Sequence, residues 1–523
     1  MIENLDTVTE EDLKYFLSGL VFVGGMTSLA LEMCASRLLG AYFGTSLYIW
    51  GCIIGLILLY LMVGYFLGGR IADRYPHEQA LYVFTTIAAL SILLIPFVCK
   101  WILGWSATAF QQISVSVFLS SLIGSMLLFA IPVTLLGLVS PYAIRLLARD
   151  VKSSGRMSGS LYAISTMGSI LGAFLPVLWL IPAVGVRKTL IIFALLLLIV
   201  SLIGLLPRLR LNIAVPVAVV ALVVIVASPL LPLGSLKDIP NLIYEQESLY
   251  NYIQVTQDPQ TGTRELILNE GEAIHSIYYP DKNKILTGWY WDYFLAAPYL
   301  NKNYQASQFK SAAIIGLAAG TIAHQITQVY GPVSIDGVEL DPAIVNVGRK
   351  YFGMNEPNLH VYTQDGRPFM ETTKHTYDLV AIDAFQQPYI PFQLTTREFF
   401  QEIHSHLSPT GVLTLNTGHT QTDYRLVQAF INTLSTVFPN VYVFNVPGTF
   451  NTEIMASMQP TSLNNFQENL SRFPSNSTMG AVASEVLPVA SVGHANGGLV
   501  FSDDKAPVEQ LTDQLLLNYI QHS

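Results

Sequence analysis

The sequence AAIIGLAAGTIAHQITQVYGPVSIDGVELDP (residues 312–342) encodes the central motif of the C-terminal half of this 523-residue chain. An apolar strand, AAIIGLA, runs into a loop of small residues, a helix is expected from Thr321 to Val329, and a second strand, VSIDGVEL, follows. Two strands joined by a helix in this way form a parallel βαβ unit. The motif therefore predicts an α/β fold for this part of the chain.

The same alternation continues toward the C-terminus. Further strands are expected at LHVYTQ (359–364), YDLVAID (377–383), GVLTLN (411–416) and NVYVFNV (440–446), with helices at Pro342–Phe352, Thr396–Leu407 and Tyr424–Val437. Short apolar strands separated by helices indicate a parallel sheet that is covered on both faces. We predict a doubly wound, Rossmann-like α/β domain.

The N-terminal half has a different composition. The whole chain is 51% hydrophobic and only 12% charged, and its long apolar runs precede residue 233. Runs of roughly 20 apolar residues can cross a bilayer as helices. We predict a polytopic α-helical membrane domain of about seven spans, at Tyr15–Leu39, Leu47–Gly69, Gln79–Val98, Ile113–Val139, Leu161–Ala183, Leu190–Leu206 and Ile213–Leu233.

A linker rich in Pro, Gly and Ser, SPLLPLGSLKDIP (228–240), separates the two halves. Just after it, the alternating runs YIQVTQ and RELILN flank a Pro/Gly turn and predict a β-hairpin. We therefore expect three parts: a membrane domain at 1–235, a small β-rich subdomain at 236–300 and the Rossmann-like domain at 301–523.

The charges between the apolar runs bear on orientation. Arginines follow the second, fourth and sixth runs, and the positive-inside rule places such loops in the cytoplasm. With seven spans, this rule would place the C-terminal domain outside. Because one span more or fewer would reverse this result, we nevertheless expect a plasma membrane protein of the bacterial inner-membrane type, with its soluble domain in the cytoplasm.

Several function classes are excluded or disfavoured. The net charge of -9 and the lack of Lys/Arg runs argue against a nucleic-acid partner. The C-terminal half contains no Cys, and no His pair with acidic partners stands at metal-ligand spacing, so no metal is expected. There is neither a Gly-x-Ser-x-Gly elbow nor a Walker loop, which disfavours serine hydrolases and P-loop NTPases.

Polar groups follow the predicted strands at the edge where parallel sheets bind ligands. The loop Gly316–Gly320 lets a ligand approach the backbone, and Glu339, at the end of the next strand, could accept hydrogen bonds from ribose hydroxyls. Asp365 with Gly366 follows the third strand, and Asp383 ends a buried strand without a basic neighbour in sequence. Upstream, Tyr290-Trp291-Asp292 could form a wall for an organic cation.

In order and spacing, these landmarks resemble the spermidine synthases, a family of polyamine aminopropyltransferases, and the whole chain resembles their membrane-integrated members. The resemblance covers residues 241–523 and includes Glu247–Asn251, Leu266–Ser276, Leu394–Phe399 and Asp503–Glu509. It implies that decarboxylated S-adenosylmethionine, or S-adenosylmethionine itself, is a substrate and that a polyamine or related amine is the acceptor. The bilayer is an expected partner, and the resemblance allows a homodimer.

The resemblance also implies residue roles. Asp383 would orient and deprotonate the attacking amine, with Tyr290 and Asp292 beside it, and 5'-methylthioadenosine would leave. Glu339 would hold the ribose, and Asp365 with Gly366 would meet the adenine. The expected cofactor-binding set is Asn251, His275, Gly316, Ala318, Gly320, Glu339, Leu340, Asp365, Gly366 and Ala384.

This sequence departs from the family where the polyamine binds. Ala319 stands where the family has an Asp that binds the amino group of the aminopropyl arm, and Gln386 stands where it has a second substrate carboxylate. A Tyr-His-Glu motif of the family has become Tyr290-Trp291-Asp292. Loss of a carboxylate would ease entry of intact S-adenosylmethionine, whose own carboxylate an Asp would repel. The alternatives are therefore a lyase that cleaves S-adenosylmethionine, a methyltransferase, and a non-catalytic nucleoside sensor that regulates a transporter-like membrane domain.

Overall fold

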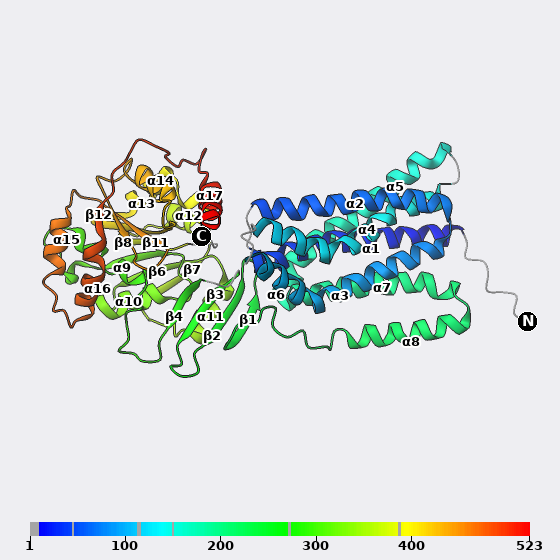
Figure 1. Ribbon diagram of the computed structural model, residues 1–523, viewed down its shortest axis with the longest axis horizontal. Coiled ribbons are helices and arrows are strands. Elements are labelled where there is room, and N and C mark those ends of the chain that lie inside the picture. Colours follow the sequence, from blue (N-terminus) through cyan, green and yellow to red (C-terminus); the bar gives the residue numbers. More distant parts are fainter. Residues whose placement is uncertain are drawn as a thin grey trace, which may run out of the picture. The chain divides into compact units, whose positions relative to one another are not determined.

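The structure is a computed structural model, and it describes residues 10–43, 47–111, 117–148, 151–269, 273–384 and 389–522. The chain divides into two compact units (Figure 1). Unit 1 comprises residues 1–238 with 246–249, and unit 2 comprises residues 239–245 with 250–523.

Unit 1 is built from long apolar helices. They are α1 (Glu10–Phe43), α2 (Leu47–Arg74), α3 (Glu78–Gln111), α4 (Val117–Leu147), α5 (Val151–Leu175), the short α6 (Ile181–Val184), α7 (Val186–Leu205) and α8 (Leu211–Ala227). Close packing of α1 on α5 depends on small residues: a Cβ atom at Gly172 would lie 2.0 Å from the Met26 carbonyl oxygen. Glycines at such crossings let helix backbones approach in the way typical of bundles in lipid.

Six helical segments of the described chain are long and apolar enough to cross a membrane, rather than the seven expected. The fifth, Ser154–Val184, runs from α5 through a π-helical turn at Pro176–Leu180 into α6. The expected seventh span corresponds to α8, which has only 17 residues and ends at Ala227, because the chain turns at Ser228 before the prolines that follow.

Unit 2 begins with a small antiparallel sheet in the order β1-β2-β3-β4, with β1 at Leu242–Glu247, β2 at Tyr252–Gln257, β3 at Arg264–Leu268 and β4 at Ile274–Tyr278. Strands β2 and β3 form the expected hairpin. The Asp258 carboxylate closes its turn by accepting hydrogen bonds from the backbone N–H groups of Gln260 and Thr261, at 2.7 and 3.0 Å. The predicted hairpin is thus confirmed.

The second sheet has eight strands in the order β12-β10-β11-β9-β8-β5-β6-β7. They are β5 (Ser311–Ile315), β6 (Ser334–Glu339), β7 (Leu359–Thr363), β8 (Tyr377–Ile382), β9 (Leu407–Gly418), β10 (Asn440–Asn445), β11 (Asn451–Ser457) and β12 (Ala490–Val492). Strands β7, β6, β5, β8 and β9 are parallel, whereas β11 is antiparallel to both β9 and β10. This confirms the predicted doubly wound α/β fold.

Helices cover both faces of this sheet (Figure 1). One apolar core joins it to α9 (Trp291–Phe294), α10 (Thr321–Tyr330), α15 (Leu463–Leu470) and α16 (Thr478–Val486). The other joins it to α12 (Gly366–Thr372), α13 (Arg397–His406), α14 (Arg425–Leu434) and α17 (Val508–His522). Helix α11 (Pro342–Tyr351) shares a third apolar cluster with β2 and β3 of the small sheet. The strand order reverses between β5 and β8, and in such sheets the carboxyl ends of the strands at this point form the ligand crevice.

Candidate active site

Asp383 follows β8 at the carboxyl edge of the sheet and accepts three side-chain hydrogen bonds. Its Oδ2 atom lies 3.2 Å from the Tyr290 hydroxyl and 3.1 Å from the Trp291 Nε1 atom. Its Oδ1 atom lies 3.0 Å from the Asn416 Nδ2 atom at the end of β9. The three donors fix the orientation of this carboxylate.

Burial raises the pKa of Asp383 to about 6, although the hydrogen bonds from Asn416, Trp291 and Tyr290 oppose this shift. A carboxyl group with such a pKa is ionised at neutral pH but takes up a proton more readily than an ordinary Asp. The group is therefore suited to accept a proton from a bound substrate.

Asp292, the third member of the Tyr-Trp-Asp motif, has different partners. Its carboxylate is fully buried and accepts hydrogen bonds from the backbone N–H groups of Thr287 and Gly288 and from the Gln325 side chain. Successive residues of a helical turn point about 100° apart, so Tyr290 and Trp291 face Asp383 whereas Asp292 fixes the preceding turn. These hydrogen bonds hold the preceding turn and do not include Asp383, and the expected catalytic role of Asp292 stays a prediction.

The glycine loop lies against the backbone of Asp383, the residue that directly follows β8. Gly316 has a φ of 90°, and a Cβ atom there would lie 2.4 Å from the Asp383 carbonyl oxygen. Ala318 also adopts a positive φ, 49°, which is uncommon for a residue with a side chain. Gly320 precedes α10, and its Cβ would meet the Met354 side chain at 2.7 Å. The two glycines thus let the loop pack tightly against the backbone of Asp383 and the side chain of Met354.

Glu339 ends β6 and lies against this loop. Its two oxygens accept hydrogen bonds from the N–H groups of Ala318, at 2.9 Å, and Asp341, at 3.0 Å. Burial raises its pKa to about 7. Asp341 caps α11 and accepts a hydrogen bond from Asn251 Nδ2 at 3.0 Å, so Asn251 and Glu339 both contact Asp341.

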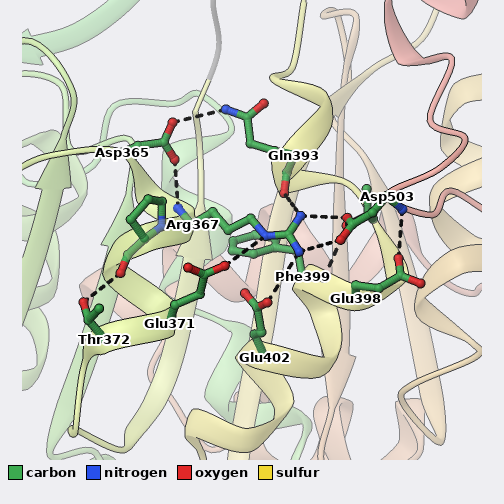
Figure 2. Close-up of polar contacts among 11 residues, drawn as sticks. Asp365, Arg367, Glu371, Thr372, Gln393, Glu398, Phe399, Glu402 and Asp503 are labelled. Atoms are coloured by element: carbon green, nitrogen blue, oxygen red, sulfur yellow. Dashed lines mark hydrogen bonds and ion pairs between the residues drawn. The ribbon is translucent and has the colours of Figure 1, made fainter.

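Asp365 caps α12, where its side chain accepts from the Arg367 N–H at 2.9 Å and from Gln393 Nε2 at 3.2 Å (Figure 2). Gly366 is required by packing, since a Cβ atom there would lie 2.4 Å from the Ile315 side chain. Asp365 therefore sits at the same edge as Glu339, after the neighbouring strand. Its capping role does not use all the acceptor capacity of a carboxylate.

The remaining expected residues frame the loop and the strand ends. His275 lies in β4, whose Ser276 hydroxyl accepts a hydrogen bond from the Ala319 N–H at 3.0 Å. Leu340 is 42% exposed after β6, and Ala384 follows Asp383. Gln386 lies outside the described residues. Among the described residues, no three His, Cys, Asp or Glu side chains are grouped as a metal site.

Sequence reasoning missed two polar residues of this site, Asn416 and Glu453. Asn416 is the last residue of the predicted strand GVLTLN, so the rule that singled out Asp383 could also have found it. Glu453 is fully buried in β11, within the apolar run EIMA, where an isolated acid is the only sequence signal.

Comparison with known proteins places this geometry in context. A family profile described as the spermine/spermidine synthase domain matches residues 301–469. A probable polyamine aminopropyl transferase from Bifidobacterium longum is 36% identical over 290 residues, which cover 52% of this chain and 62% of that protein. The polyamine aminopropyltransferase of Vibrio vulnificus is 30% identical over 234 residues, which cover 43% of this chain and 74% of that protein.

Solved structures are also similar. A probable spermidine synthase from Corynebacterium glutamicum aligns with a TM-score of 0.41 and 22% identity, over 51% of this chain and 96% of that structure. The match to the Bifidobacterium protein spans less than two thirds of that protein's length.

Proposed function

Because this chain belongs to the polyamine aminopropyltransferase family of transferases, we propose that unit 2 transfers an aminopropyl group from decarboxylated S-adenosylmethionine to an amine and releases 5'-methylthioadenosine. The observation that carries this proposal is the buried carboxylate of Asp383, which three side-chain donors orient at the ligand edge of the sheet.

The proposed reaction is an in-line displacement at a carbon atom bonded to the sulfonium. The lone pair of the acceptor nitrogen attacks the methylene carbon next to the sulfonium, that carbon–sulfur bond breaks, and its electron pair neutralises the sulfur. Asp383 accepts the proton that the nitrogen loses. Holding the two reactants in line supplies much of the acceleration, because it converts a bimolecular step into a unimolecular one.

The nucleoside would be held by groups that follow the strands. Glu339 would accept from the ribose hydroxyls in exchange for its present bonds to the loop, and Asp365 with Gly366 would meet the adenine. Asn251, next to Asp341, would complete the contact from the small sheet. Backbone N–H groups of the loop from Gly316 to Gly320 would line the remaining side.

Ala319 favours a second candidate function. Its side chain is buried and carries no charge, so the loop does not repel the α-carboxylate of intact S-adenosylmethionine. The second candidate is cleavage of S-adenosylmethionine to methylthioadenosine without an amine.

One assay separates these functions. The purified full chain is given decarboxylated S-adenosylmethionine with a panel of di- and triamines, and methylthioadenosine is quantified by mass spectrometry. Amine-dependent release supports transfer to an amine. Release from S-adenosylmethionine without an amine establishes the lyase, a methylated product establishes a methyltransferase, and nucleoside binding without turnover establishes a sensor.

We also propose that unit 1 is embedded in a membrane and that unit 2 is cytoplasmic. Arginines follow α2, α4 and α7, and the positive-inside rule places the chain ends that carry them in the cytoplasm. After six crossings the chain that follows α7 is on that same side. With 17 residues, α8 is roughly 25 Å long, shorter than the hydrocarbon core of about 30 Å.

A Lys282→Cys variant tests this topology. The introduced thiol should react with an impermeant maleimide only after cell lysis, and labelling of intact cells would contradict a cytoplasmic unit 2.

A further inference from the structure

A second buried carboxylate, Glu453, lies near Asp383 and has no part in the mechanism above. Its side chain in β11 has no exposed surface. The Oε2 atom accepts a hydrogen bond from the Thr414 hydroxyl at 3.3 Å, whereas the Oε1 atom is buried without any hydrogen-bond partner among the described residues. A buried acceptor without a partner is costly and indicates that something is missing from the site.

The sheet register places Glu453 on the face that carries the active site. Glu453 pairs with Asn416 across the antiparallel β9–β11 ladder, and side chains of directly opposed residues lie on the same face. Asn416 in turn donates to Asp383. Burial is the largest cause of the raised pKa values of Tyr290 and Tyr293, and nearby negative charges raise them further. The charge of Glu453 is one of these in both cases, so its carboxylate lies near both rings.

The two carboxylates have no basic partner. Neither Asp383 nor Glu453 forms an ion pair with a Lys, Arg or His of the described chain; the side-chain partners of both are neutral. Burial, followed by the charge of Asp383, raises the pKa of Glu453 well above its usual range. Two buried acids beside aromatic rings form a site that a cation would complement.

We propose that Glu453 binds a second, positively charged nitrogen of the acceptor from strand β11. This inference rests on the proposed function and specifies its substrate class. Asp383 takes the reacting nitrogen and Glu453 takes a distant one, so the acceptor is a diamine or longer polyamine rather than a monoamine.

The test measures binding, which needs no turnover. Putrescine and spermidine are titrated by calorimetry into the full chain in detergent, saturated with methylthioadenosine. Glu453→Gln keeps an oxygen for Thr414 but removes the charge, and we expect the amine dissociation constants to rise roughly 10- to 100-fold while methylthioadenosine binds as before. Glu485→Gln, which removes a half-buried acid of the neighbouring helix α16, is the matched control and should leave amine affinity unchanged.

Unchanged amine affinity in Glu453→Gln overturns the inference, as does failure of the wild type to bind either amine. Should the variant fail to fold, the wild type still gives an answer: putrescine must bind roughly 10-fold or more tightly than butylamine, which lacks the second nitrogen, and equal affinities refute the role of Glu453. Amine binding without methylthioadenosine release rejects the proposed transferase reaction but supports the site.

Discussion

Arg367 donates two parallel hydrogen bonds to Asp503, one from each terminal nitrogen to a separate carboxylate oxygen, both at 2.7 Å (Figure 2). The pair joins the start of α12 to a segment 136 residues later in the chain. Thr396 donates to the same carboxylate at 2.7 Å. Asp503 thus links its own segment of the chain to helix α12, which Asp365 caps, and to Thr396.

Asp503→Asn should lower the melting temperature of unit 2. The guanidinium of Arg367 lowers the pKa of Asp503, so the stabilisation is present above the ordinary Asp pKa and is lost as the pH falls through the lowered value. Because Asp503 is 43% exposed, we expect about 1 kcal/mol. Asp504→Asn changes a neighbouring exposed acid and is the control. Equal melting temperatures for the two variants at pH 7 would show that the Arg367–Asp503 ion pair does not stabilise unit 2.

Asp383→Asn should abolish most turnover while methylthioadenosine still binds. Asn cannot accept the proton from the attacking nitrogen, and loss of a general base typically costs a factor of roughly 10² to 10⁴ in rate. Single-turnover rates and calorimetric nucleoside affinity provide the measurement. A variant that turns over at the wild-type rate would falsify the assigned role.

The activity of the wild type should rise with pH through about 6. Asp383 must be ionised to accept a proton, and its raised pKa places the acidic limb of kcat/KM there. In Asn416→Leu the carboxylate loses a donor that favours its charged form, so the limb should move upward by roughly one unit. The check is a pH–rate profile of both proteins, and a downward or absent shift contradicts the assignment.

Glu339→Gln should weaken methylthioadenosine binding at least roughly 10-fold, because a neutral amide presents one acceptor oxygen where a carboxylate presents two. The pKa of Glu339, raised to about 7 by burial, also predicts that wild-type affinity falls as the pH drops below 7, when the group becomes protonated. Titrations at pH 6 and 8 test both points. The variant should lose this pH dependence; if it persists, another group causes it.

Asp292→Asn should destabilise the protein more than it alters chemistry. The amide would turn a donor toward the backbone N–H groups of Thr287 and Gly288, at a cost of about 2 to 3 kcal/mol. A lower melting temperature with near-normal kcat in the folded protein is expected. A large fall in kcat without loss of stability would restore the catalytic role that the sequence motif suggests.

Periodicity and strand-end chemistry predicted the α/β fold and brought Glu339, Asp365 and Asp383 to one edge, since parallel strands share that edge whatever their order. Their neighbours across the sheet were harder to foresee. Glu453 reaches the site only because β11 returns antiparallel to β9, and no local signal specifies that pairing. The partners of Asp292 were also hard to foresee, because successive residues of a helical turn point in different directions and the motif does not say which of them turns toward Asp383.

The close approach of Gly316 to the carbonyl of Asp383 bears on how this protein can be diversified. Position 319 carries only a methyl group, which is buried in the apolar cluster formed by α11 with β2 and β3, so a library at this position should be restricted to small side chains. Position 316 must stay fixed, because any added carbon would push away the strand end that holds the proton acceptor. The glycine loop is thus constrained at two positions, 316 by the backbone of Asp383 and 319 by the core around it, and variation of the site has to come from residues outside this loop.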